Sequence, residues 1–190
     1  MNLQQLIEKN RSYRRFQENY KIEQNTLLGL IDLARLSASA ANIQPLKYST
    51  SCDTDRNQLI FPSLGWAGYL NSWNGPEKEE RPSAYIIILG DTQLSNSFTF
   101  DAGIAAQSIL LGATELGLGG CMIGSLKRDQ LRKSLAIDTR YEILLVLALG
   151  KPVEEVLIEK MPADGNVKYW RGKDKVHHVP KRELKEIIIN

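Results

Sequence analysis

The sequence predicts a single α+β domain. Residues 84–90 and 142–150 are apolar runs of strand length that end in glycine, as expected for central strands covered on both faces. Residues 22–40 and 101–116 have the composition and spacing of helices. A chain of 190 residues is long enough for one such domain with its own core and short for two.

The elements between these strands can be justified in order. In residues 22–40 the apolar side chains recur at helical spacing, as at Leu27, Leu30 and Ala34. Residues 101–116 are rich in Ala, Gly and Ile, so we expect a helix buried in the core or in a dimer interface, closed by Gly117. Residues 131–135 predict a short further helix.

After residue 150 the composition changes. Residues 153–190 contain too few large apolar side chains for a core of their own, yet Trp170, Leu184 and Ile187 need to be buried. We therefore expect one domain over residues 1–190, in which 151–190 form a C-terminal arm that lies across a partner subunit. A solvated tail is the alternative.

Residues 10–16 place the guanidinium groups of Arg11, Arg14 and Arg15 around the hydroxyl of Ser12. The planar fork of arginine donates pairs of hydrogen bonds to phosphate oxygens, so this motif suits a phosphomonoester. If the segment is extended, Arg11 and Arg15 share one face and Arg14 takes the other. The alternative is a basic surface patch beside a helix end.

Residues 37–45 form a second motif, in which small side chains surround Ser39, Asn42 and Gln44 before Pro45. Small side chains let the backbone approach a planar ligand, and the two carboxamides offer the donors and acceptors that the pyrimidine edge of a flavin requires. Pro45 ends the turn because it disfavours helical conformation at the residue before it. An ordinary polar loop is the alternative.

These two motifs, taken with Gly117-Leu118-Gly119-Gly120-Cys121-Met122-Ile123-Gly124, resemble the nitroreductase family of FMN flavoproteins in order and separation across nearly the whole chain. The resemblance implies a nitroreductase-like fold, with a central, mostly antiparallel β-sheet flanked by helices, in an intertwined homodimer. It also implies that FMN lies at the subunit interface.

The resemblance assigns roles to individual residues. The first motif would hold the ribityl phosphate, the second would meet the ring and ribityl chain, and the third would pass the flavin edge, with the backbone of Ile123 or Gly124 near N5. A basic residue near the chain end would complete the phosphate site. The implied cofactor-binding residues are Arg11, Ser12, Arg14, Arg15, Ser39, Asn42, Gln44, Cys121, Met122, Ile123, Gly124, Lys181 and Arg182.

The implied reaction is hydride transfer from NADH or NADPH through flavin N5 to a nitroaromatic, a quinone or a related acceptor, by a ping-pong mechanism. The flavin carries this chemistry, so no catalytic side chain is expected. Two alternatives stay open: a flavin-fragmenting or reductive-dehalogenase member of the superfamily, and an FMN-binding protein without turnover by nicotinamide. Leu46 and Met122 replace aromatic residues common in the family, which leaves the substrate undecided.

Residues 61–76 mix aromatic residues with glycines and are the candidate for a lid over the ring. In this interpretation Phe61, Trp66 and Tyr69 stack on flat substrates while the glycines permit movement. The same aromatic residues could simply cover the sheet.

Composition argues against several other classes. The net charge is +2 and the charges are mixed, so no nucleic-acid-binding stripe is evident. The first residues do not form a signal peptide and no apolar run reaches membrane-spanning length, so we expect a cytoplasmic protein. Cys52 and Cys121 are far apart, and the adjacent His177 and His178 have no ligand spacing, so no metal site is expected.

Overall fold

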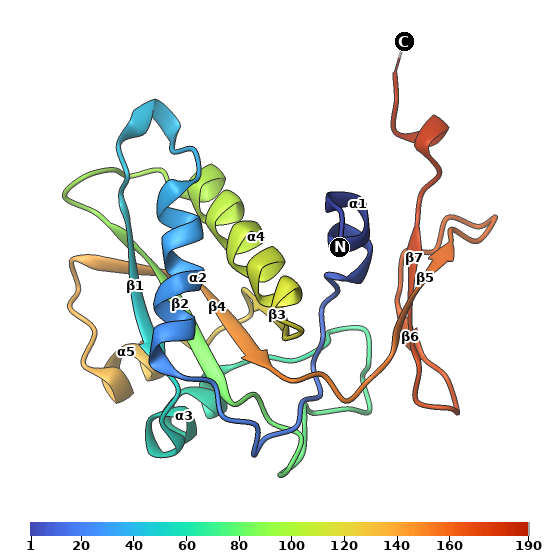
Figure 1. The fold of residues 1–190 in the computed structure, drawn as a ribbon, viewed down its shortest axis with the longest axis horizontal. Helices are drawn as coiled ribbons and strands as arrows, with labels where there is room; N and C mark the ends of the chain where they lie inside the picture. Colours follow the sequence, from blue (N-terminus) through green and yellow to red (C-terminus); the bar gives the residue numbers. More distant parts are fainter. Residues whose placement is uncertain (190) are drawn as a thin grey trace.

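The computed structural model describes residues 1–189. Its centre is a four-stranded sheet with the order β1-β2-β4-β3, in which every neighbouring pair is antiparallel (Figure 1). The strands are β1 (Leu46–Ser51), β2 (Ala84–Asp91), β3 (Gly119–Ile123) and β4 (Tyr141–Gly150). The predicted α+β class and both predicted central strands are confirmed. All eight residues of β2 are buried, as its unbroken apolar run predicts.

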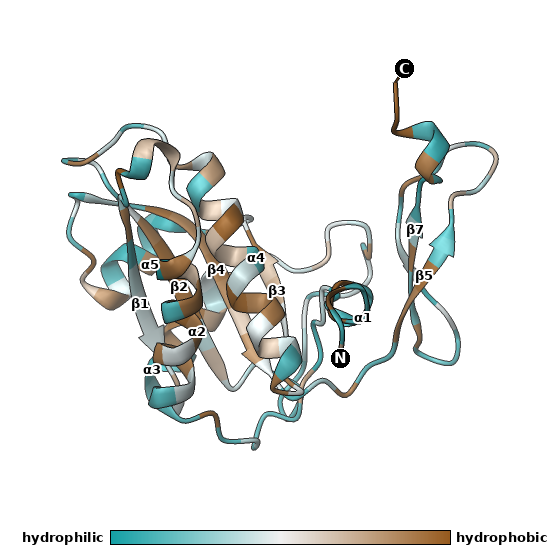
Figure 2. Ribbon diagram, turned by 45° about the horizontal axis from the view of Figure 1, so that its top comes forward, coloured by the Kyte–Doolittle hydropathy of each residue, from teal (hydrophilic) through white to brown (hydrophobic). Residues whose placement is uncertain are grey.

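Helices cover both faces of this sheet. The helices α2 (Gln24–Leu36) and α4 (Thr99–Glu115) lie on one face, and α3 (Thr54–Ile60), the short helix η2 (Phe61–Ser63) and α5 (Arg128–Leu135) lie on the other. Alternate residues of β2 supply the two cores, with Ile86 and Ile88 facing α2 and α4 and Ile87 on the opposite side. Figure 2 shows hydrophobic residues running along α4 and the central strands.

One irregularity interrupts the pairing of β2 with β4. Ile88 pairs with Leu145 but Leu89 pairs with Ile143, so Leu144 is an extra residue in β4. Such a bulge places two consecutive side chains on the same side of the sheet, and Leu144 and Leu145 both pack against the core that faces α2 and α4.

Helix α4 is buried on the side that faces the sheet and α2, whereas Phe100 and Ile104 on its other side are exposed in the single chain. It begins at Thr99 rather than Asp101, and it ends before Gly117, whose φ of +72° lies in the left-handed region that favours glycine. Gly112 lets α2 pack closely, because a Cβ there would lie 2.4 Å from Leu33 Cδ1. With 17 residues, α4 is about 25 Å long.

The helix predicted over residues 22–40 is shorter than expected. It ends at Leu36, and the next residue, Ser37, has an extended backbone; the Ser37 hydroxyl donates to the carbonyl of Leu33 and lies 2.7 Å from Ser108 Oγ of α4. Residues beyond it form a loop with a single turn of 3-10 helix, η1 (Ala40–Asn42). The helix predicted at 131–135 begins earlier, at Arg128.

The chain begins with α1 (Leu3–Lys9), which packs against α4 and is capped by Asn2 and Gln5. The segment after it runs beside the sheet without forming a regular strand: Ser12 bridges Gly120 of β3, and Phe16 bridges Pro152. Phe16 is fully buried and Tyr13 is half-buried, so both side chains anchor this segment to the rest of the protein.

The C-terminal part forms a second, three-stranded sheet that stands apart from the central one (Figure 1). Its strands are β5 (Val156–Lys160), β6 (Trp170–Arg171) and β7 (His177–Lys181), followed by the short helix η3 (Leu184–Glu186). The central strand β7 pairs parallel with β5 and antiparallel with β6. The arm thus has its own sheet, and its apolar end, including Leu184, Ile187 and Ile189, is exposed in the single chain.

Within residues 1–189 no helix combines the length and the apolarity that crossing a bilayer requires.

We expect Gly120→Ala to lower the free energy of unfolding by about 1–3 kcal/mol, because overpacked cores have to shift their side chains or backbone. A Cβ at Gly120 would lie 2.5 Å from Leu110 Cδ2 and 2.9 Å from the carbonyl oxygen of Ala148. Urea unfolding measures the change. The matched control is Gly29→Ala in α2, where a Cβ meets nothing within 4 Å, and helix propensity predicts a gain of about 0.5–1 kcal/mol. Equal effects of the two variants would contradict the packing argument.

Candidate cofactor site

The first and third motifs lie side by side. Ser12 bridges Gly120, and the backbone N–H of Tyr13 donates to the carbonyl of Gly120 over 3.0 Å. Gly119 is required at this contact, because a Cβ there would lie 2.6 Å from the ring of Tyr13. The contact with the edge of β3 therefore fixes the backbone of the segment that contains Arg11 and Arg14.

The side chains of Arg11 and Arg14 line a hollow of about 260 Å³, which we call the basic hollow. Its lining residues are Asn10, Arg11, Ser12, Arg14, Tyr169, His177, Val179 and Lys181. The two ends of the chain thus meet here. In β7, His177, Val179 and Lys181 alternate with residues that face away, so the strand register selects Lys181 and leaves Arg182 outside the hollow.

The structure corrects the expected facing of the arginines. Arg11 and Arg14 line the same hollow, whereas Arg15 points elsewhere. The cause is a tight turn in which the N–H of Tyr13 bonds to the carbonyl of Arg11, which breaks the alternation of an extended strand.

Arg15 is engaged in a different contact. Its Nε donates to Glu80 Oε2 over 2.6 Å, and a second guanidinium nitrogen binds Glu80 Oε1. This hydrogen-bonded ion pair raises the pKa of Arg15 and lowers that of Glu80. Arg15 therefore fastens the first motif to the segment before β2 and is not among the residues that line the basic hollow.

The guanidinium of Arg14 is held from several sides. Its Nη1 donates to the carbonyl of Ser12 over 3.2 Å and lies 3.2 Å from Nε2 of His177, while Cζ lies 4.9 Å from the ring centre of Tyr169. Arg11 donates to the carbonyl of Ile7 over 2.6 Å, and its Nε is buried without a partner among the described residues. Both arginines keep donors available for an anion.

Glu154 supports this arrangement from outside the hollow. Its side chain is 1% exposed, accepts the backbone N–H groups of both Arg14 and Arg15, and forms an ion pair with Arg171 at 3.0 Å. Because Arg171 offsets its charge, Glu154 can position the first motif without cancelling the positive charge of the hollow.

His177 is 1% exposed, and its Nδ1 has no partner among the described residues. Burial and, to a smaller extent, the charges of Arg14, Arg171 and His178 together lower the pKa of this imidazole to about 4. The ring is therefore neutral at pH 7, and Nε2 can accept a hydrogen bond from Arg14.

We expect the lowered pKa of His177 to make the protein less stable as pH falls from about 6.5 to about 4, since the unfolded chain binds a proton that the folded chain rejects. The expected loss is about 2 kcal/mol after allowance for solvent screening. Urea unfolding at pH 7.5 and pH 5 measures it. His177→Gln should abolish this slope and His178→Gln should keep it; an unchanged slope in His177→Gln would contradict the assignment.

The second motif lies at the other end of α4. The N–H of Ala40 donates to the buried carboxylate of Asp101 in the first turn of α4 over 3.2 Å, whereas the first motif lies next to Gly119, just past the end of this helix. Figure 1 shows the loop after α2 at the start of α4, and α1 near its end. In one chain the two motifs are therefore separated by about the 25 Å length of α4.

The loop of the second motif is strained. Ala41, Asn42 and Gln44 have φ values of 48°, 53° and 54°, which residues with side chains adopt at a cost of about 1–2 kcal/mol each. Ser39 Oγ accepts the N–H of Gln44 over 2.9 Å, while the side chains of Asn42 and Gln44 are exposed. Strain of this kind concentrates at ligand sites.

Only part of the third motif is exposed to solvent. Cys121 and Ile123 are buried, Met122 is 38% exposed and Gly124 is exposed at the end of β3. Burial raises the pKa of the Cys121 thiol, which keeps it protonated, as a packed side chain rather than a nucleophile would be. Among residues 1–189 no group of three or more His, Cys, Asp or Glu side chains is placed to hold a metal ion.

The structure separates the three lid candidates. Trp66 packs against the core on the α3 side of the sheet, and its ring lies 5.8 Å from that of Phe61. Tyr69 is exposed and lies 5.0 Å from the ring of Tyr169, which in turn lies 5.0 Å from His177. Only Tyr69 is therefore connected to the basic hollow.

Comparisons with known proteins show similarity to nitroreductases. Residues 73–151 match the model of the Nitroreductase family. MhqN of Bacillus subtilis (strain 168), which carries the name of an NAD(P)H nitroreductase, is 22% identical over 79% of this chain and 88% of its own.

Two solved structures share the fold. A protein from Exiguobacterium sibiricum 255-15, described as a nitroreductase in complex with FMN, aligns with TM-score 0.68 and 19% identity over 80% of this chain and 89% of its own. One from Bacteroides thetaiotaomicron VPI-5482, described as an NADH dehydrogenase/NAD(P)H nitroreductase, aligns with TM-score 0.69 and 20% identity over 98% and 96%.

The chain is thus an α+β protein with the nitroreductase-like fold. The resemblance to the nitroreductase family that the three motifs predict is confirmed, by the family match over the middle of the chain and by its relatives.

Proposed function

We propose that this protein is an FMN-dependent oxidoreductase that uses NADH or NADPH to reduce a nitroaromatic, a quinone or a related small acceptor. The observation that carries the proposal is the basic hollow, where Arg11, Arg14 and Lys181 surround Ser12 and none of the described lining residues is acidic. This donor set suits a phosphomonoester. The names of the relatives and the FMN complex of a structural neighbour support the same cofactor.

In this proposal the chain's residues bind and orient the cofactor. Arg11, Ser12, Arg14 and Lys181 would hold the phosphate, and the buried, unpartnered Nε of Arg11 is one donor that an anion would satisfy. The exposed end of β3 at Gly124 would offer backbone N–H groups beside the ring. When bound, FMN supplies the redox chemistry: hydride uptake from NAD(P)H at N5 and delivery of electrons to the acceptor.

We further propose a homodimer in which each FMN contacts the first motif of one chain and the second motif of the other. The length of α4 between the two motifs supports this division. Apolar side chains that a partner would cover support it too: Phe100 and Leu116 of the α4 region are 76% and 59% exposed, and Ile187 and Ile188 of the tail are 62% and 51% exposed. A cytoplasmic location, where NADH and NADPH are available, completes the proposal.

The absorption spectrum of the purified, FMN-loaded protein tests this function. We expect flavin bands that bleach on anaerobic addition of NADH or NADPH and return on addition of a quinone. The comparison of the two nucleotides identifies the preferred donor. Bands that persist would contradict turnover driven by nicotinamide, and a protein that takes up no FMN would contradict the whole proposal.

A further inference from the structure

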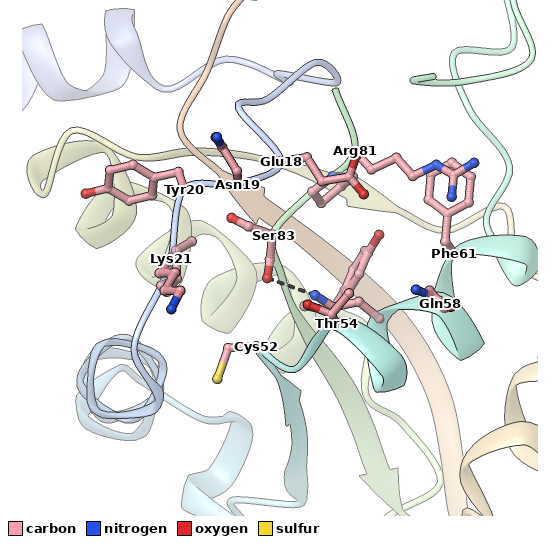
Figure 3. A pocket seen from close by; sticks show the side chains of 14 residues that line it. Glu18, Asn19, Tyr20, Lys21, Cys52, Thr54, Gln58, Phe61, Arg81 and Ser83 are labelled. Atoms are coloured by element: carbon pink, nitrogen blue, oxygen red, sulfur yellow. Dashed lines mark hydrogen bonds between the residues drawn. The ribbon is translucent and has the colours of Figure 1, made fainter. Parts of the chain in front are cut away.

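The loop of residues 67–74, which we call the aromatic loop, is closed at its base. Gly75 lies against Trp66, so closely that a Cβ on Gly75 would be 2.5 Å from Trp66 Cδ1. Further out along the chain, the guanidinium carbon of Arg81 lies 4.3 Å from the ring centre of Phe61, a contact that Figure 3 shows. The base of the aromatic loop is therefore fixed, and the course of its middle depends on other contacts.

The C-terminal arm supplies two of these contacts. Within residues 1–189, the backbone–backbone hydrogen bonds of the aromatic loop all stay inside the loop. Its aromatic side chains reach the arm instead: the ring of Tyr69 lies 5.0 Å from that of Tyr169, and the ring centre of Trp73 lies 4.5 Å from the guanidinium carbon of Arg171. The hydroxyl of Tyr169 also accepts the N–H of Tyr69 over 3.4 Å. The arm thus holds the middle of the loop at two points.

The strand geometry of the arm brings these contacts to one face. Tyr169 and Arg171 flank Trp170, which faces the other way and stacks on His178 with ring centres 5.0 Å apart. His177, which pairs with Arg171 in the sheet, lies on the same face as Tyr169, and their ring centres are also 5.0 Å apart. One face of the arm therefore carries both the loop contacts and residues that line the basic hollow.

Both loop contacts continue to Arg14. Tyr169 lines the basic hollow, and its ring centre lies 4.9 Å from Cζ of Arg14. Arg171 lies 3.0 Å from Glu154 Oε2, and the other carboxylate oxygen of Glu154 accepts the backbone N–H of Arg14. The side chain and the backbone of one arginine are thus tied to the aromatic loop, each by a short chain of contacts.

Such contacts make two binding events reciprocal. An anion that binds Arg14 restricts its guanidinium, so less conformational entropy remains to be lost when Tyr169 and the loop pack against it. By linkage, the packed loop raises the affinity of the hollow for the anion by the same factor. Tyr69 is not among the residues that line the hollow, so it acts on the anion through Tyr169.

We propose that Tyr169 is a positioning residue that couples the phosphate part of the site to the aromatic loop. An oxyanion bound at Arg14 immobilises residues 67–74, and the loop strengthens the binding of that oxyanion. The inference rests on the proposed function only in taking the oxyanion to be the phosphate of FMN. It assigns the loop to the phosphate end of the flavin site, whereas the aromatic composition of residues 61–76 predicts a lid over the ring.

Hydrogen exchange of residues 67–74, followed by mass spectrometry, tests the coupling in the flavin-free protein and after addition of inorganic phosphate, FMN or riboflavin. We expect phosphate and FMN to slow exchange about fivefold or more, and riboflavin, which has no phosphate, to leave it unchanged. Tyr169→Leu should abolish the slowing, and Tyr169→Phe, which keeps the ring, should retain most of it. Trp170→Leu is the matched control, because Trp170 faces away from the loop and its loss should change nothing.

Ligand affinity measures the reciprocal effect from the side of the loop. Tyr69→Ala removes a side chain that is 48% exposed and outside the hollow, so the fold should tolerate it. We expect this variant to raise the Kd for FMN several-fold and to leave the Kd for riboflavin unchanged. Equal effects on the two ligands would contradict a coupling to the phosphate.

The coupling and the flavin proposal can fail separately. Phosphate that slows exchange of the loop in a protein that binds no FMN would support the coupling and contradict the flavin cofactor. In a protein that does bind FMN, three results would overturn the coupling alone: exchange that neither phosphate nor FMN slows, slowing by riboflavin equal to that by FMN, or slowing that survives in Tyr169→Leu.

Discussion

Replacing Arg14 by Ala is expected to raise the Kd for FMN about 10- to 100-fold, because a charged donor to phosphate contributes about 1.5–3 kcal/mol. Arg14 lines the basic hollow with Arg11, Ser12 and Lys181, and His177 and Tyr169 hold its guanidinium in place. The quenching of FMN fluorescence on binding measures the Kd.

Arg15→Ala is the matched control, since it removes the same group from the next residue. Arg15 forms an ion pair with Glu80 and does not line the basic hollow, so its loss should leave the Kd for FMN nearly unchanged. It should instead lower the free energy of unfolding, by about 1 kcal/mol or more, because Glu80 loses its partner. Equal losses of FMN affinity in both variants would contradict the division of roles.

Riboflavin lacks the phosphate of FMN. Comparing the two ligands therefore shows which part of FMN Arg14 contacts. If Arg14 contacts the phosphate, Arg14→Ala should weaken FMN and leave riboflavin almost unaffected. A loss that is equal for both ligands would place Arg14 against the ring or ribityl chain, or show that its removal deforms the hollow.

Local pattern predicts the framework of this protein well. The unbroken apolar runs of β2 and β4 and the small residues of α4 identify buried elements, because burial on every side leaves no polar alternation. The end of α2 is less predictable. Alanines favour a continued helix after Leu36, and the contact of Ser37 with Ser108, 71 residues away in sequence, favours the loop.

The arginines show what spacing cannot predict. Whether Arg14 or Arg15 lines the hollow depends on a tight turn at Tyr13 and on Glu80, which is 65 residues away. The sequence offers Lys181 and Arg182 as equal candidates, and only the structure distinguishes them: Lys181 is the last residue of β7 and lines the hollow, whereas Arg182 follows the strand and does not. Tyr169 and His177 belong to no motif, and only the folding of the arm brings them to Arg14.

The second large expected effect is complementation between variants, which follows if the site is divided between two chains as proposed. We expect a mixture of two variants, each defective in FMN binding, to regain about a quarter of the sites when subunits exchange at random. One variant is Arg14→Ala, which damages the first motif. The other is Asn42→Gly in the second motif, which removes the carboxamide and suits the left-handed φ of 53°.

The proportion follows from the geometry. In a mixed dimer, one site combines the two damaged motifs and the other combines the two intact ones, so half of its sites are restored. Random exchange makes half of the dimers mixed. If both motifs of a site came from one chain, every site would keep one damaged motif, and mixing would restore none.

The experiment is to unfold the two variants together, refold them, and titrate FMN at concentrations between the Kd of the original protein and those of the variants. Refolding each variant alone is the control, and neither should gain sites. Recovery near a quarter of the sites would support a flavin held between the first motif of one chain and the second motif of its partner. The absence of any recovery, with exchange shown by mass spectrometry, would mean that the ligand reaches only one end of α4, and that the strained loop at Ala41, Asn42 and Gln44 serves another purpose.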